Sequence, residues 1–266
     1  MNNSNLLHSV IKIAKQAGEA ILAVYHNQEA MAVQIKADQS PLTQADIAAH
    51  TVIIEALSKL TPEWPVLSEE GAEIPYAERA KWQRYWLIDP LDGTREFIER
   101  NGEFTVNIAL IENHEPSLGV VYAPILNTCY FAQKNHGAYK QIGESVPQPI
   151  QTKRLQNREL TIIGSRHHGR AEIENFLKPF PPHQIIYSGS AIKFCLVAEG
   201  RADLYPRLTP TSEWDTAAAQ CVLFAAGGNV FIKEGGALLY NTKASLQNPS
   251  FLAVGDLNFN WLQYWQ

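Results

Sequence analysis

The chain has 266 residues, of which 45% are hydrophobic and 18% charged, and its formal net charge is −5. This length and composition suffice for a sizeable core in one large unit or two coupled domains. The negative charge argues against a nucleic-acid-binding surface, because neutralising many phosphates requires a basic excess. A small anionic ligand stays compatible with this charge if metal ions supply the positive charge.

The sequence predicts an intracellular protein. No secretory signal is recognised, and no run approaches the about 18 apolar residues of a membrane span. The three cysteines, Cys129, Cys195 and Cys221, lie in apolar runs without a metal-binding spacing. They predict buried thiols in a reducing compartment.

Hydrophobic periodicity predicts two regions of different organisation. Apolar residues recur at helical spacing over residues 6–21 and 47–60, which predicts two long amphipathic helices. Short apolar or alternating runs follow and predict a mostly antiparallel sheet, with strands at 66–67, 85–88, 104–111, 118–123 and 128–133. After residue 150 the two types alternate, with strands at 160–164, 184–187, 202–205 and 229–232 and helices at 171–177, 191–200 and 216–226. The pattern predicts an α+β domain over residues 1–150 and a smaller α/β domain over residues 151–266.

Residues 86–94, with the sequence WLIDPLDGT, carry the strongest chemical signal. The predicted strand ends in Asp89 and Asp92, whose carboxylates would repel each other unless a cation lay between them, and such hard oxygens suit Mg²⁺. Gly93 lets the backbone approach an anion, and Thr94 offers a hydroxyl and an N–H group at a predicted helix start. The simpler interpretation is a turn in which these residues serve only turn geometry.

Three further acidic segments favour the metal interpretation. Glu69 and Glu70 follow a predicted strand, Asp215 opens the predicted helix at 216–226, and Asp46 lies near the start of the second helix. Each has a structural interpretation, as surface charge, as a helix N-cap and as a first-turn helix acid respectively. Together with the two aspartates above, they predict a metal-dependent phosphate site.

The order of these motifs, followed by Gly227 and Gly228, resembles the Mg²⁺-dependent, lithium-sensitive phosphatase superfamily. This superfamily includes inositol monophosphatase, fructose bisphosphatase and the 3′(2′),5′-bisphosphate nucleotidases, and the chain is most similar to the bacterial nucleotidases of CysQ type. The resemblance covers nearly the whole chain, since it extends to residues 36–41, 100–109, 119–124 and 188–200. It implies a layered αβαβα fold, with an antiparallel sheet and a helix pair followed by a smaller α/β layer.

The resemblance also implies a hydrolase that uses two or three Mg²⁺ ions and direct attack by water. Asp46 and Thr94 would orient and deprotonate that water. The role of Glu70 is left open: it could tune a metal-bound water, bind a third metal ion or support the metal ligands from behind. The implied metal ligands are Glu69, Asp89, the Leu91 carbonyl, Asp92 and Asp215, with Asp89 bridging two ions.

The implied reaction converts adenosine 3′,5′-bisphosphate to AMP and phosphate, in sulfur assimilation and nucleotide recycling. An inositol monophosphatase-like sugar phosphatase is the alternative, and a sensor without turnover is disfavoured because every expected carboxylate is present. Lys193 and Arg207 would supply charge for the non-reacting phosphate, although each also fits an ordinary solvated cation. The implied substrate contacts are Glu69, Leu91, Asp92, Gly93, Thr94, His168, Ser190, Lys193, Arg207 and Asp215.

The resemblance finally implies a cytoplasmic monomer or homodimer without a transmembrane segment or a nucleic-acid partner. Peripheral contact with the cytoplasmic face of the inner membrane is the alternative location.

Overall fold

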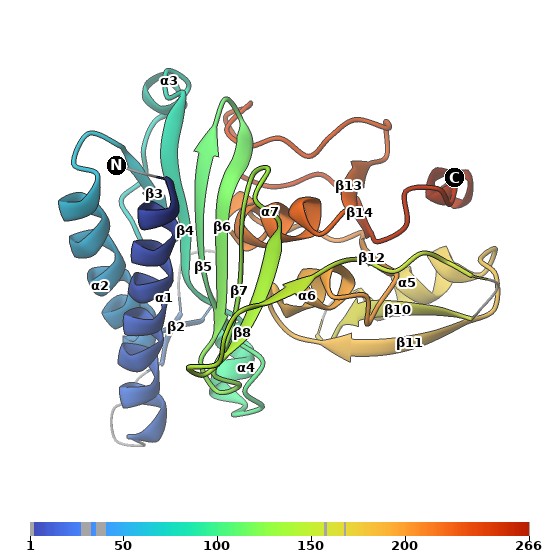
Figure 1. The fold of residues 1–266 in the computed structure, drawn as a ribbon, viewed down its shortest axis with the longest axis horizontal. Coiled ribbons are helices and arrows are strands. Elements are labelled where there is room, and N and C mark those ends of the chain that lie inside the picture. Colours follow the sequence, from blue (N-terminus) through green and yellow to red (C-terminus); the bar gives the residue numbers. More distant parts are fainter. Residues whose placement is uncertain (1–2, 28–32, 36–40, 157–158, 168, 266) are drawn as a thin grey trace.

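The computed structural model describes residues 3–27, 33–35, 41–156, 159–167 and 169–265, and Figure 1 shows their arrangement in layers. Within these ranges, every helix is too short or too polar to cross a bilayer. The three cysteines are free and buried, as the apolar runs around them predict. A short antiparallel pair, β1 (Val33–Ile35) and β2 (Pro41–Thr43), precedes the main layers.

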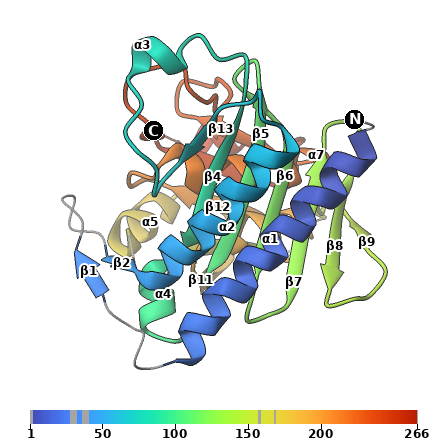
Figure 2. The same cartoon turned by 90° about the vertical axis from the view of Figure 1, so that its left-hand side faces the viewer.

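The first layer consists of the two predicted helices, α1 (Asn3–His26) and α2 (Gln44–Leu60). Figure 2 shows both helices lying across one face of the large sheet. Helix α2 begins where Thr43 acts as N-cap, because its hydroxyl accepts from the Ala45 N–H at 3.2 Å. The predicted helix pair is therefore confirmed.

The second layer is a seven-stranded sheet in the order β3-β4-β5-β6-β7-β8-β9. All neighbouring pairs are antiparallel except β3 and β4, which are parallel. Side chains alternate across it: Trp86 and Ile88 pack with the helix pair, and Leu87 packs on the opposite face. Its strands are β3 (Val66–Ser68), β4 (Arg84–Asp92), β5 (Thr105–Glu112), β6 (Glu115–Ala123), β7 (Thr128–Gln133), β8 (Ala138–Ile142) and β9 (Gln148–Ile150).

The third layer contains α6 (Ile192–Ala198) and α7 (Ala217–Ala225), which are buried between the two large sheets. Helix α7 lies against β6 at Gly119, where an added Cβ would stand 2.2 Å from the Ala218 carbonyl oxygen. Only glycine permits this approach of helix to strand.

The fourth layer is a five-stranded sheet in the order β11-β10-β12-β14-β13. It is mixed, because β10 pairs parallel with β11 and β12, whereas β14 pairs antiparallel with β12 and β13. The sequence prediction omitted β14, since its four consecutive buried residues show no alternation. The strands are β10 (Leu160–Ser165), β11 (His183–Ser188), β12 (Leu204–Arg207), β13 (Asn229–Ile232) and β14 (Phe251–Val254).

The fifth layer comprises α5 (Arg170–Leu177) and the 3-10 turn η3 (Trp261–Tyr264). Ile173 and Trp261 pack with Ile162 and Leu252, whereas the neighbours of those strand residues face the middle helices. The order helix, sheet, helix, sheet, helix confirms the αβαβα fold. The domain boundary at residue 150, between β9 and β10, stays a prediction.

Candidate metal centre and active site

The end of β4 brings the first acidic residues together. Because β3 and β4 run parallel, Glu69 at the end of β3 lies beside Asp89, and the Glu69 N–H donates to the Ile88 carbonyl at 3.2 Å. The pairing of β4 with β5 shifts register between Asp89 and Asp92. Such an irregularity changes the direction of side chains at a strand end.

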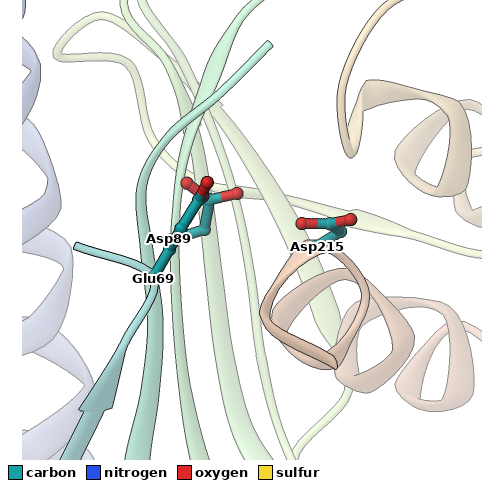
Figure 3. A group of neighbouring side chains, drawn as sticks. All are labelled: Glu69, Asp89 and Asp215. Carbon is teal, nitrogen blue, oxygen red and sulfur yellow. The ribbon is translucent and has the colours of Figure 1, made fainter. Parts of the chain in front are cut away.

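Three carboxylates converge at this point (Figure 3). Glu69, Asp89 and Asp215 each offer an oxygen atom, and these atoms lie within 4.8 Å of one another. Asp215 reaches the cluster from the short 3-10 turn η2 (Glu213–Asp215) and accepts from the Ser212 N–H at 2.8 Å. The N-cap interpretation of Asp215 is therefore wrong, because Thr216 lies between it and α7 and takes the N-cap position.

The electrostatics of this cluster fit a divalent cation. Burial raises the pKa of Asp89 well above its ordinary value, and the charges of Glu69, Asp92 and Asp215 raise it further. Burial, followed by the charges of Asp92 and Glu69, does the same for the pKa of Asp215. A cation among these oxygens would offset both burial and repulsion, and an all-oxygen donor set is the one that Mg²⁺ and Ca²⁺ prefer.

Asp92 lies next to the cluster, and its carboxylate contacts β5 and the turn before α6. Its Oδ2 accepts from the Ala191 N–H at 2.6 Å, from Asn107 Nδ2 at 3.2 Å and from the Thr105 hydroxyl at 3.5 Å. Burial raises the pKa of Asp92, whereas the charge of Lys193 opposes the rise. Asp92 is not among the three converging acids, so its role as a metal ligand stays a prediction.

Thr105 and Asn107 were missed by the sequence analysis. The detectable signal was polar side chains at alternate positions of an otherwise apolar strand, on the same face and directly opposite the aspartates of β4.

Asp46 caps helix α2 with one carboxylate oxygen and contacts Thr94 with the other. Its Oδ2 accepts from the Thr43 N–H at 2.8 Å and from the Thr43 hydroxyl at 2.6 Å, which completes the capping box of α2. Its Oδ1 accepts from the Thr94 hydroxyl at 3.3 Å. The first-turn interpretation is correct, and Asp46 also contacts Thr94, because its two oxygens face different partners. The catalytic role of this pair stays a prediction.

The turn between β4 and α4 (Thr94–Ile98) holds the remaining predicted residues. The Leu91 N–H donates to Asp89 Oδ1 at 3.0 Å, and the Leu91 carbonyl lies 3.5 Å from the Thr94 hydroxyl. Gly93 has a φ of +97°, in the left-handed region that favours glycine. The sequence interpretation of Gly93 as a backbone requirement is consistent with this conformation.

A cavity of about 240 Å³ opens beside the acids. Its lining includes predicted site residues from both sheets. Glu69 is not one of them and lines a neighbouring cavity. Glu96, which the sequence analysis did not select, also lines the first cavity; its signal was an acid in the first turn of the helix that follows the motif. His168 lies outside the described residues. The predicted residues on the wall are Asp92, Gly93, Thr94, Ser190, Lys193, Arg207 and Asp215.

The two cations on the wall have different surroundings. Lys193 is buried, its Nζ donates to the Ser190 carbonyl at 2.6 Å, and burial lowers its pKa to about 8. Arg207 is half-buried, and its guanidinium donates to the carbonyls of Thr209 at 3.1 Å and Pro210 at 3.0 Å. Ser190 has a φ of +48°, and this turn carries it to the cavity wall.

Known proteins resemble the chain over most of its length. The profile of the inositol monophosphatase family matches residues 2–255. The 3′(2′),5′-bisphosphate nucleotidase CysQ of Escherichia coli K12 is 50% identical over 249 residues, covering 92% of this chain and 98% of that protein. The protein of the same name from Haemophilus influenzae is 38% identical over 99% of this chain and 98% of its own length.

Solved structures agree with this relationship. The crystal structure of CysQ from Bacteroides thetaiotaomicron, described as a bacterial member of the inositol monophosphatase family, superposes with a TM-score of 0.81. It shares 41% identity and covers 94% of this chain and 97% of its own. Fold, acidic cluster and sequence therefore agree, and the chain belongs to the inositol monophosphatase family of phosphatases.

Proposed function

We propose that this protein is a Mg²⁺-dependent 3′(2′),5′-bisphosphate nucleotidase that hydrolyses the 3′-phosphate of adenosine 3′,5′-bisphosphate to AMP and phosphate. The observation that carries the proposal is the single cavity wall that joins the acidic Asp92 and Asp215 to the cationic Lys193 and Arg207. A substrate with two phosphates needs both kinds of site. The printed names of the relatives support the same substrate class. A role in sulfur assimilation and nucleotide recycling is part of the proposal.

The proposed metal ligands are Glu69, Asp89, the Leu91 carbonyl, Asp92 and Asp215, for two or three ions. When bound, Mg²⁺ supplies positive charge for the phosphoryl oxygens and acidifies a water molecule. Without metal, these buried acids resist full ionisation, as the raised pKa values of Asp89 and Asp215 show. Metal binding and ionisation of the cluster are therefore coupled.

Thr94 and Asp46 are the proposed catalytic pair. The Thr94 hydroxyl donates to Asp46 Oδ1, so its oxygen lone pairs are free to accept a proton from the attacking water while its own proton passes to Asp46. The water oxygen forms a bond to phosphorus, and the bond from phosphorus to the ribose oxygen breaks. The ribose oxygen takes a proton from solvent water and leaves as the hydroxyl of AMP, and Asp46 then releases its proton to solvent. The capping bonds from Thr43 to Asp46 hold the carboxylate in place for this transfer.

A phosphate-release assay across nucleotide bisphosphates and inositol phosphates tests the proposal. We expect adenosine 3′,5′-bisphosphate to have the highest kcat/KM and AMP to accumulate in equal amount with phosphate. A preference for inositol 1-phosphate would instead identify a sugar phosphatase. Two further points stay predictions: a cytoplasmic location, with the inner face of the membrane as the alternative, and a monomeric or homodimeric state.

A further inference from the structure

Glu96 is an acid of the cavity wall that the proposed mechanism does not use. It lies in the first turn of α4 and is 7% exposed. A Cβ added to Gly93 would stand 3.3 Å from Glu96 Oε2, and one added to Gly189 would stand 2.7 Å from Glu96 Oε1. The carboxylate therefore fits between two glycines, where the turn after Asp92 meets the turn that precedes α6.

The described partners of Glu96 do not use all the acceptor positions of its carboxylate, which leaves room for a donor from a ligand. Its ion pair with His167 is long, at 3.7 Å, because the same Nε2 lies nearer to Glu99 Oε2, at 3.1 Å. Burial raises the pKa of Glu96, a hydrogen bond from its own backbone N–H opposes the rise, and the charge of Asp92 adds to it. A buried carboxylate at a cavity wall is stabilised by a hydrogen-bond donor on whatever fills the cavity.

The position of Glu96 determines which substrate group its carboxylate can contact. Under the proposed function, the reacting phosphate lies between the acidic cluster and Thr94. The carboxylate of Glu96 abuts Gly93, the residue between Asp92 and Thr94, so it is next to that phosphate. A phosphate bound there would bring the carbon adjacent to the reacting ester, and the groups on it, within reach of Glu96. A carboxylate there attracts a hydroxyl group and repels a second phosphate.

We propose that Glu96 determines specificity by accepting a hydrogen bond from a free hydroxyl on the carbon next to the one that carries the reacting phosphate. This inference rests on the proposed function. In adenosine 3′,5′-bisphosphate the donor is the 2′-hydroxyl, and in the 2′,5′ isomer it is the 3′-hydroxyl. One carboxylate thus suits both isomers, because exchanging the two positions preserves a neighbouring hydroxyl.

The test compares kcat/KM for adenosine 3′,5′-bisphosphate and its 2′-deoxy analogue in the wild-type protein, Glu96→Ala and Glu96→Gln. We expect the wild type to prefer the ribonucleotide by about tenfold to hundredfold, the range of one charge-assisted hydrogen bond. Glu96→Ala should bring the ratio close to one, and Glu96→Gln, which keeps a carbonyl acceptor without charge, should lie between.

Glu199→Gln is the matched control, because the Glu199 side chain is also buried and paired, with Lys140 at 2.6 Å, but it is not among the described cavity-lining residues and does not contact His167 in the described structure. It should keep the wild-type ratio. If Glu96→Ala does not fold, the nearly isosteric Glu96→Gln tests the inference through its ratio of kcat/KM for the two nucleotides. Equal losses on both nucleotides, or a wild type that does not discriminate between them, overturn the inference and leave the proposed function standing. Hydrolysis of neither nucleotide overturns both.

Discussion

The Ala191 N–H donates a 2.6 Å hydrogen bond to Oδ2 of Asp92, which joins the turn between β11 and α6 to the end of β4. A second acid repeats this arrangement, since Glu103 accepts from the Gly189 N–H at 2.8 Å and from Arg166 at 2.6 and 2.9 Å. Asp92 at the end of β4 and Glu103 just before β5 thus hold the turn that places Ser190 at the cavity. The shape of the cavity depends on both layers, so substitutions at their junction should affect substrate choice as well as turnover.

The mutual repulsion of Glu69, Asp89 and Asp215 predicts an absolute requirement for Mg²⁺. Phosphate release should fall to background in chelator and return when Mg²⁺ is added. Li⁺ should inhibit because it carries less charge, and Ca²⁺ should inhibit because its longer bonds and looser geometry suit the reaction poorly. Full activity after exhaustive chelation would contradict the proposed site.

Asp92→Asn should lower kcat by at least about a hundredfold, as expected when a group that holds or orients a metal is lost. Without metal, the variant should melt at the same temperature as wild type or higher, because burial penalises the ionised carboxylate. Asp203→Asn is the control, since Asp203 is also buried but accepts from the Thr161 N–H and is not among the described cavity-lining residues. If Asp92→Asn retained turnover at saturating Mg²⁺, Asp92 would not be a ligand.

Thr94→Val should reduce kcat by about 10² to 10⁴, the usual contribution of general acid–base catalysis, with a smaller change in KM. The substitution removes the hydroxyl that donates to Asp46 and keeps the branched shape. Thr94→Ser restores a hydroxyl and should recover most of the rate. Comparable losses in the Val and Ser variants would indicate that packing at this position, not proton transfer, controls the rate.

Much of the fold was predictable because its signals are local. The helix pair and the central strands show clear periodicity, and the acidic motifs end predictable strands. Strands β8 and β9 were missed, because most of their residues are partly exposed and follow no buried alternation. Strand β14 was missed for the opposite reason, since all four of its residues are buried.

The site was predictable where residues are adjacent in sequence and less so where the tertiary fold brings them together. The pairing of Asp46 with Thr94 followed only from family resemblance, since 48 positions separate them. The bond from Ala191 to Asp92 spans 99 positions and has no sequence signal at all. Arg207 was expected to face a phosphate, and its bonds to the carbonyls of Thr209 and Pro210 were not foreseen.

Arg207→Ala should lower kcat/KM for adenosine 3′,5′-bisphosphate by about tenfold to hundredfold, the value of one charge-assisted contact. Hydrolysis of inositol 1-phosphate, which lacks a second phosphate, should barely change. Arg201→Ala provides a control for charge, because Arg201 is exposed and pairs with Glu199. Equal losses on both substrates would show that Arg207 supports the loop at 209–210 and does not bind the second phosphate.

Deprotonation of Lys193 should lower kcat/KM for the bisphosphate at alkaline pH. Burial lowers its pKa from 10.5 to about 8, although the charge of Asp92 opposes the shift and that of Arg207 adds to it. In the folded protein the ammonium is therefore charged below about pH 8 and neutral above it. Because kcat/KM reports groups of the free enzyme, kcat/KM for the bisphosphate should fall as pH rises through that value.

The free energy of unfolding depends on pH in the opposite direction. The stabilising contribution of neutral Lys193 is fully present above pH 10.5 and is lost as pH falls through about 8. Lys193→Arg keeps its charge throughout this range and should move the alkaline fall in kcat/KM to higher pH, measured relative to its own rate at pH 7. An unchanged fall in the arginine variant would assign the alkaline loss to another group.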